Sequence, residues 1–202
     1  MKIVMIGPSG SGKGSLAEFL TKHYEVPHIS TGDLFRQNKE IKEKYVDQGI
    51  FVPDEVTVKM VIERIARPDC KKGFILDGFP RTLNQAQLLD KSVKIDQVVE
   101  TDSSDETVHV RLGGRYTCRK CNTIHNTRNE DVSKCRSCKS ADMYQRDDDK
   151  TEKIQKRLDQ YRVGARPLLD FYRKKGIVVV VTSELKDKPA DMYAKYLKMI
   201  KK

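Results

Sequence analysis

The stretch 7-GPSGSGKGS-15 constrains the fold of this chain more than any other feature. Gly7, Gly12 and Lys13 have the spacing G-x-x-x-x-G-K, and the apolar run 3-IVMI-6 comes directly before them. In such a loop, backbone N–H groups surround phosphate oxygens at the N-terminus of a helix, and the lysine reaches the outer phosphates. The stretch therefore predicts a strand, a phosphate-binding loop and a helix over residues 13–24, rather than a plain glycine-rich turn.

Short apolar runs alternate with helical patterns along the rest of the chain. The apolar runs are residues 3–6, 28–29, 74–76, 97–100 and 177–181, and the helical patterns are residues 15–24, 82–90, 105–112 and 190–200. Strands that are apolar along their whole length are typical of a parallel sheet covered by helices on both faces. We therefore predict an α/β fold with a five-stranded parallel sheet flanked by helices, and a further long helix over residues 151–175. Ligands of such sheets bind at the carboxyl ends of the strands, where the glycine-rich loop and 77-DGFPR-81 both lie.

The charge of the chain is positive but finely mixed. A formal charge of +10 arises from 39 Lys and Arg against 29 Asp and Glu in 202 residues. Residues 38–48 and 184–202 interleave the two signs, which favours solvated helix faces over a nucleic-acid surface. No run of 18 apolar residues exists, and the N-terminal apolar run is too short for a signal peptide. We expect a cytoplasmic monomer with no membrane partner.

Four of the five cysteines form two close pairs, 118-CRKC-121 and 135-CRSC-138, and Cys70 stands apart. This spacing is typical of a structural zinc site in which Cys118, Cys121, Cys135 and Cys138 are the ligands, with another soft metal or free thiols as alternatives. A polar segment of this length cannot bury a core of its own, so a metal would order it. The second pair is the less regular one, because Lys139 follows it and lysine tolerates a positive φ angle less well than Asn122 does.

Four motifs together resemble the adenylate kinases and their nucleoside monophosphate kinase relatives. They are the loop with Gly14 and Ser15 after Lys13, then 30-STGDLFR-36, 77-DGFPRTLNQAQ-87 and 146-RDDD-149. The resemblance covers nearly the whole chain and implies a fold of the P-loop NTP hydrolase type. It implies a core domain of residues 1–29, 53–112 and 149–202, a helical insertion of residues 30–52 that binds the nucleoside monophosphate (NMP), and a zinc-ribbon-like lid of residues 113–148.

The resemblance also implies a reaction, the magnesium-dependent transfer of the γ-phosphoryl group of ATP to AMP, giving two ADP. The ATP-binding residues would be Gly10, Ser11, Gly12, Lys13, Gly14, Ser15, Arg111, Arg115, Thr123, Ile124 and Lys186. The AMP-binding residues would be Thr31, Arg36, Ile50, Phe51, Val52, Gly78, Phe79, Pro80, Arg81, Gln85, Arg146 and Arg157. The catalytic residues would be Lys13, Arg81, Arg115, Arg146 and Arg157. Ser15 and Asp77 would lie near the magnesium ion, and the zinc would be structural.

Two other functions fit parts of the sequence. A UMP or CMP kinase would use the same scaffold, although Thr31 and Gln85 accompany AMP in the family that the chain resembles. A nucleic-acid-binding module would use the four cysteines and the basic residues around them. Single-strand binders usually stack bases on several aromatic rings, and this segment offers only Tyr116 and Tyr144. We therefore expect ATP and AMP as partners and no nucleic acid.

Overall fold

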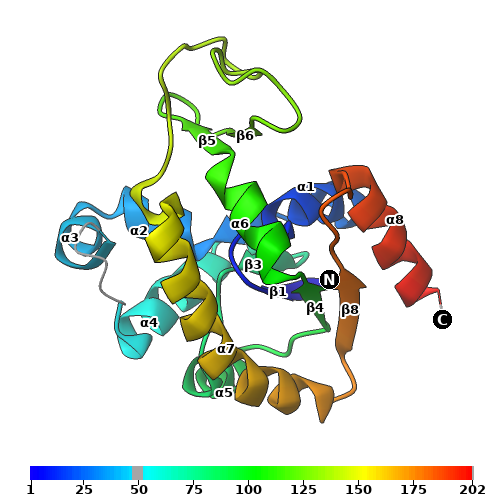
Figure 1. Ribbon diagram of the computed structural model, residues 1–202. Coiled ribbons are helices and arrows are strands. Elements are labelled where there is room, and N and C mark those ends of the chain that lie inside the picture. Colours follow the sequence, from blue (N-terminus) through cyan, green and yellow to red (C-terminus); the bar gives the residue numbers. More distant parts are fainter. Residues whose placement is uncertain (47–51, 202) are drawn as a thin grey trace.

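The computed structural model describes residues 1–46 and 52–201. Within that part of the chain, the main sheet has five parallel strands in the order β2-β3-β1-β4-β8 (Figure 1). The strands are β1 (Lys2–Ile6), β2 (His28–Ser30), β3 (Phe74–Asp77), β4 (Gln97–Asp102) and β8 (Val178–Thr182). The predicted α/β fold with a five-stranded parallel sheet is confirmed.

Helices cover both faces of this sheet because alternate strand residues point to opposite sides. On one face, Ile3 and Met5 pack with Leu20 in a buried cluster that includes α1 (Lys13–Tyr24) and α8 (Pro189–Ile200). On the other face, Val4 packs in a cluster with residues such as Leu168. That second cluster is supplied by α4 (Asp54–Ile65), α5 (Leu83–Ser92) and α7 (Thr151–Arg173). A smaller cluster joins α7 to α6 (Asp105–Gly113).

The edge strand β8 is less covered than the sequence pattern implies. Val181 is 1% exposed, but Val180 is 38% exposed. The strand has a neighbour on one side only, since β4 pairs with it and it ends the sheet. An apolar run therefore indicated a strand here without showing that both faces are buried.

Two smaller units depart from the alternation of strand and helix. After β2 come two short helices, α2 (Thr31–Gln37) and α3 (Lys39–Ile41), and a π-helical turn (Lys42–Val46). After α6 the chain leaves the main sheet and forms an antiparallel sheet in the order β6-β5-β7, at the top of Figure 1. Its strands are β5 (Arg115–Cys118), β6 (Ile124–Asn126) and β7 (Met143–Tyr144).

Two short 3-10 turns complete the architecture. One is formed by Pro68–Cys70, before β3, and the other by Asp147–Asp149, where the chain returns from the small sheet to α7. Within the residues described, none of the helices combines the length and the apolar character needed to cross a bilayer.

Helix α7 provides a matched test of the core, since Leu168 is 1% exposed and Val163, on the same helix, is 81% exposed. Leu168→Ala removes buried methyl groups and leaves a cavity, so we expect it to lower the free energy of unfolding by about 2–5 kcal/mol. Val163→Ala should change it by less than about 0.5 kcal/mol. Urea unfolding followed by circular dichroism measures both. Equal effects of the two substitutions would contradict the packing described for α7.

Candidate functional site

The glycine-rich loop between β1 and α1 is closed tightly against β4. Gly10 and Gly12 have φ angles of 82° and 90°, which favour glycine. A Cβ atom at Gly7 would lie 2.2 Å from the Thr101 hydroxyl, so that position has no room for a side chain. The same hydroxyl lies 2.6 Å from the hydroxyl of Ser11, which is fully buried. Ser11 thus anchors the loop through its side chain.

The contribution of Thr101 was missed in the sequence. Its only signal is its position near the carboxyl end of β4, whose sequence is QVVETD. That is the edge of a parallel sheet where ligand sites are found.

The ammonium group of Lys13 lies inside the curve of the loop. Its Nζ donates to the carbonyl oxygens of Gly7 and Pro8, at 2.8 and 2.7 Å. Burial lowers the pKa of Lys13 to about 8, although the charge of Asp77 opposes that change. Nearby arginines lower it further. Among the described residues this partly buried cation pairs with no carboxylate, so an incoming phosphate would stabilise it.

Asp77 ends β3 beside the loop. Its Oδ2 atom lies 3.4 Å from His28 Nε2, and a Cβ atom at Gly14 would be 3.7 Å from the same oxygen. Burial raises the pKa of Asp77, but His28 and the charge of Lys13 outweigh it, so the carboxyl is held below its usual range. Ser15, in the first turn of α1, is exposed. The contact between Asp77 and His28 was not predicted from the sequence.

Two arginines share one buried carboxylate on the side of the small sheet. Arg115 donates to both oxygens of Asp149 at 2.7 and 2.6 Å, and the Asp149 side chain has no exposed surface. Arg157 lies 2.8 Å from an Asp148 oxygen and 3.3 Å from an Asp149 oxygen. It also donates to the Ser9 hydroxyl at 2.6 Å. Residues of the small sheet, of α7 and of the phosphate loop are thereby brought together.

Three further arginines have other partners. Arg81 donates to the Gly78 carbonyl at 2.8 Å, Arg146 donates to the Thr117 hydroxyl at 3.1 Å, and Arg36 pairs with Asp33 at 2.5 Å. Burial lowers the pKa values of Arg81, Arg146 and Arg157, and repulsion from neighbouring arginines adds to that effect. We call the set of Lys13, Arg36, Arg81, Arg115, Arg146 and Arg157 the cationic cluster. Guanidinium groups bind phosphate through paired hydrogen bonds, so the cluster is suited to a polyanionic ligand.

The residues expected around the AMP base lie at the other edge of the site. Thr31 is fully buried, and its hydroxyl donates to the Asp77 carbonyl at 3.3 Å. Gln85 Nε2 donates to Asp54 at 2.6 Å, while its Oε1 accepts from the Arg81 N–H at 2.7 Å. The fixing of Gln85 by Asp54, from another helix, was not predicted.

Six further positions were expected to line the AMP pocket. Gly78 has a φ angle of 82°, and a Cβ atom there would lie 2.8 Å from the Thr31 hydroxyl. Phe79 and Pro80 are buried, and Phe79 packs in the core, so their side chains support the site from behind. Val52 is 9% exposed, and its carbonyl accepts from the Thr57 hydroxyl at 3.4 Å. The expected contacts of Ile50 and Phe51 lie outside the described residues.

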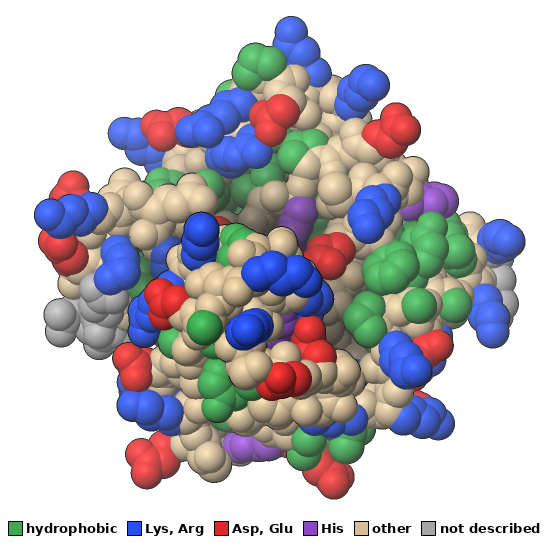
Figure 2. All heavy atoms as spheres, turned by 90° about the horizontal axis from the view of Figure 1, so that it is seen from above, with side chains coloured by type: hydrophobic (Ala, Val, Ile, Leu, Met, Phe, Trp, Pro, Cys, Tyr) green, Lys and Arg blue, Asp and Glu red, His purple; other side chains and the backbone are tan. Residues whose placement is uncertain are grey.

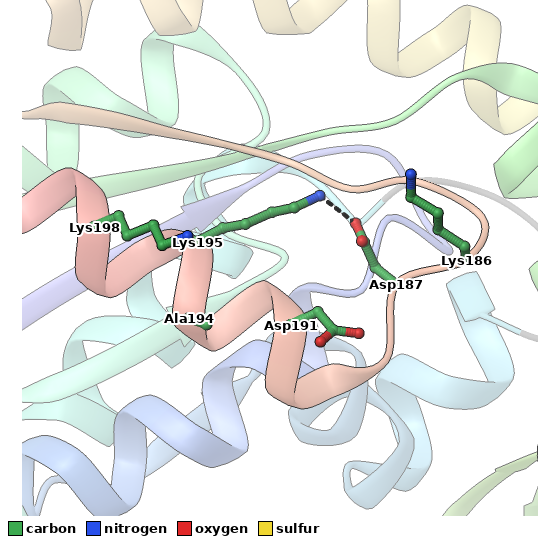
Figure 3. Close-up of a pocket in the computed structure, with 6 residues that line it drawn as sticks. All are labelled: Lys186, Asp187, Asp191, Ala194, Lys195 and Lys198. Carbon is green, nitrogen blue, oxygen red and sulfur yellow. Dashed lines mark hydrogen bonds and ion pairs between the residues drawn. The ribbon is translucent and has the colours of Figure 1, made fainter.

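The residues expected around the ATP base lie farther apart than those expected around the AMP base, on three different parts of the molecule. Arg111 reaches the loop, with Nη1 3.4 Å from the Gly10 carbonyl and 2.7 Å from the Ser183 hydroxyl. Ile124 is 44% exposed on the small sheet. Lys186 instead lies on the exposed segment before α8 and pairs with Glu184 at 3.1 Å. In Figure 3 it borders a hollow lined by charged side chains of α8, where Lys195 points toward Asp187.

The four paired cysteines form one cluster in the small sheet. Their sulfur atoms all lie within 4.8 Å of one another, and the Cys118–Cys138 and Cys121–Cys135 sulfurs are each 3.5 Å apart. Tetrahedral zinc with bonds of about 2.3 Å separates its sulfurs by about 3.8 Å. The residues after the two pairs adopt the same left-handed turn, with φ angles of 58° at Asn122 and 61° at Lys139. The lysine therefore does not prevent the second turn, and the four residues fit a metal ion.

The surface around this small sheet carries both charges. Figure 2 looks down on it from above, and the Lys and Arg side chains are intermingled there with Asp and Glu. Arg119, for example, lies 3.4 Å from Asp142, and Arg136 pairs with Glu130. This mixture gives no support to the nucleic-acid-binding alternative.

A phosphate-binding loop at the carboxyl edge of a parallel sheet, facing a cationic cluster, defines a nucleotide-binding protein of the P-loop class. A family model described as adenylate kinase matches residues 5–177. An adenylate kinase of Caldicellulosiruptor bescii is 41% identical over 196 residues, covering 89% of this chain and 90% of the relative. One of Treponema denticola is 46% identical over 190 residues, covering 89% and 90%. One of Archaeoglobus fulgidus is 43% identical over 194 residues, covering 88% of each. The chain belongs to the adenylate kinase family and is a phosphotransferase.

The buried ammonium group of Lys13 predicts a pH dependence of nucleotide binding. A bound phosphate favours the charged lysine, whose pKa is about 8 in the free protein. Affinity for ATP should therefore be highest below pH 8 and weaken as the pH rises to 9.5, with uptake of protons on binding. Titration calorimetry in two buffers of different ionisation enthalpy measures both quantities. Lys13→Arg should remove most of this dependence, and an unchanged pH profile in that variant would contradict the assignment to Lys13.

Proposed function

We propose that this protein catalyses the reversible, magnesium-dependent transfer of the γ-phosphoryl group of ATP to AMP, giving two ADP. The observation that carries the proposal is the cationic cluster, which extends from Lys13 in the phosphate loop to Arg36 and Arg81 beside the second and third strands. A nucleotide switch needs one phosphate site, whereas a kinase needs to hold a donor and an acceptor at once. In phosphoryl transfer the protein mainly aligns the two and neutralises charge on the transferred group.

The donor would occupy the phosphate loop. The backbone of Gly10–Ser15 and the Lys13 ammonium would hold the β- and γ-phosphates, in place of the two carbonyls that Lys13 contacts in the free protein. Arg111 and Arg115 would flank the donor from α6 and β5. Thr123 and Ile124 would lie near its base, and contact with Lys186 stays a prediction.

The acceptor would lie between Arg36 and Arg81, which would hold the AMP phosphate. Thr31 and Gln85 would meet its base. After its bonds to Asp54 and the Arg81 N–H, the Gln85 amide retains one N–H and one oxygen lone pair. Such a pair can recognise a base that presents an acceptor beside a donor, as adenine does. Asp54 would therefore hold Gln85 in one fixed orientation toward the base.

The transferred group would lie between these two sites. Arg81, Arg115, Arg146 and Arg157 would surround it together with Lys13, because their fixed positive charges match the charge on its equatorial oxygens. Magnesium bound with ATP would neutralise part of the charge on the phosphate oxygens. Asp77 and Ser15 offer the carboxylate and hydroxyl oxygens that this ion favours, largely through water.

The outer units would act as moving parts. We assign residues 30–52 to an NMP-binding insertion and residues 113–148 to a lid, with residues 1–29, 53–112 and 149–202 as the core. Closure would bring Arg115 and Arg146 onto the phosphates and exclude water, and adenylate kinase is itself a standard example of such motion. Zinc held by the four cysteines would order the lid without taking part in the chemistry.

The acceptor preference tests the proposed reaction. With ATP and magnesium, kcat/KM should be at least about 100-fold higher for AMP than for GMP, UMP or CMP, because a mismatched base leaves buried polar groups unpaired. Coupled measurement of diphosphate formation gives the four values. Lys13→Met, which lacks the ammonium, serves as the control for contaminating kinases. A preference for UMP or CMP would assign the related pyrimidine kinase activity, and no turnover with any acceptor would overturn the proposal.

The metal content tests the zinc assignment. We expect one zinc per chain by elemental mass spectrometry of protein purified without chelators. Cys138→Ser removes one of the four clustered sulfurs and should lose most of the zinc. Cys70→Ser is the matched control, because that buried thiol lies outside the cluster. Zinc-free wild-type protein from zinc-supplemented cells would contradict the assignment.

A further inference from the structure

His125 is a buried polar residue that the proposed reaction does not use. It lies in the middle of β6 and is 0% exposed, whereas its neighbour Ile124 is 44% exposed. In the small sheet it pairs directly with Tyr116 of β5. Because alternate strand residues share a face, His125 lies on the same side of the sheet as Cys118, toward the cysteine cluster.

One nitrogen of the ring is held in place. His125 Nδ1 lies 3.1 Å from Glu130 Oε2 and 3.4 Å from Arg136 Nη1, and Arg136 also pairs with Glu130. Arg136 is the residue directly after Cys135. The ring is therefore fixed next to the second cysteine pair.

The other nitrogen lacks a partner. His125 Nε2 is buried and makes no hydrogen bond of normal geometry within the described residues. Buried polar groups of this kind are uncommon and call for a ligand or a partner that is missing. The ring faces the cysteine side of the small sheet and lies beside Arg136, which follows Cys135 in the chain, so the Cys135 sulfur is the candidate partner for Nε2.

We propose that His125 donates a hydrogen bond from Nε2 to the Cys135 thiolate and so positions that ligand of the metal site. The geometry at Nδ1 permits this in two ways. A neutral ring that accepts from Arg136 carries its proton on Nε2, and an imidazolium that donates to Glu130 carries a proton on both nitrogens. Four thiolates on a divalent ion leave a net negative charge, which a donor to one sulfur offsets. His125 is thus a positioning residue, which acts on the metal through Cys135.

The inference rests on the proposed zinc site, and two substitutions test it in the full-length protein. His125→Leu has similar bulk and no donor, whereas His125→Gln retains an N–H group near the position of Nε2. We would measure the rate of zinc transfer to a coloured chelator and the thiolate-to-metal absorption of the Co²⁺-substituted protein. His125→Leu should release zinc about 10- to 100-fold faster and shift the Co²⁺ band, while His125→Gln should stay close to wild type.

The outcomes separate this inference from the proposed function. If the wild-type protein takes up neither zinc nor tetrahedral Co²⁺, the metal site itself is wrong. If the wild type loads normally and His125→Leu matches it in both readouts, the role of His125 is overturned. If His125→Leu loads no metal, His125→Gln decides: normal loading supports a hydrogen-bond donor, and an equal loss shows that the ring serves packing alone.

Discussion

The buried carboxylate of Asp149 is the group on which the arrangement of the site depends. It joins Arg115 of the small sheet to Arg157 of α7, and Arg157 in turn contacts Ser9 of the phosphate loop. An unpaired buried charge is costly, so the three groups hold one another in position. Asp149 can do this because the chain makes a short 3-10 turn where it returns to the core.

The arginines divide into two kinds around that carboxylate. Arg115 and Arg157 are neutralised by Asp149 and Asp148, whereas Arg81 and Arg146 are bonded to a carbonyl and a hydroxyl. Because these partners are neutral, Arg81 and Arg146 keep their positive charges available for a ligand. A phosphoryl group entering the site would therefore meet cations whose positions are already fixed, which is the condition for electrostatic stabilisation without reorganisation.

The sequence was sufficient for the features that depend on local pattern. The phosphate loop, the parallel strands and the cysteine cluster all follow from spacing and periodicity within short segments. It was insufficient where distant segments meet. The contacts of Thr101 with Ser11, of His28 with Asp77 and of Asp54 with Gln85 join residues 90, 49 and 31 positions apart, and no periodic pattern marks them. Lys139 shows a third case, since the tight turn around the cysteine pair overrides the preference of its residue type.

The proposed reaction requires the cationic cluster to hold two nucleotides at the same time. Calorimetric titration of AMP into protein saturated with a non-hydrolysable ATP analogue and magnesium tests this most directly. One AMP should bind per chain, with an affinity equal to or higher than its affinity for the free protein, since each nucleotide neutralises charge on its own part of the cluster. Loss of AMP binding in the saturated protein would show that the two nucleotides compete for a single phosphate site and would contradict the proposed transfer between them.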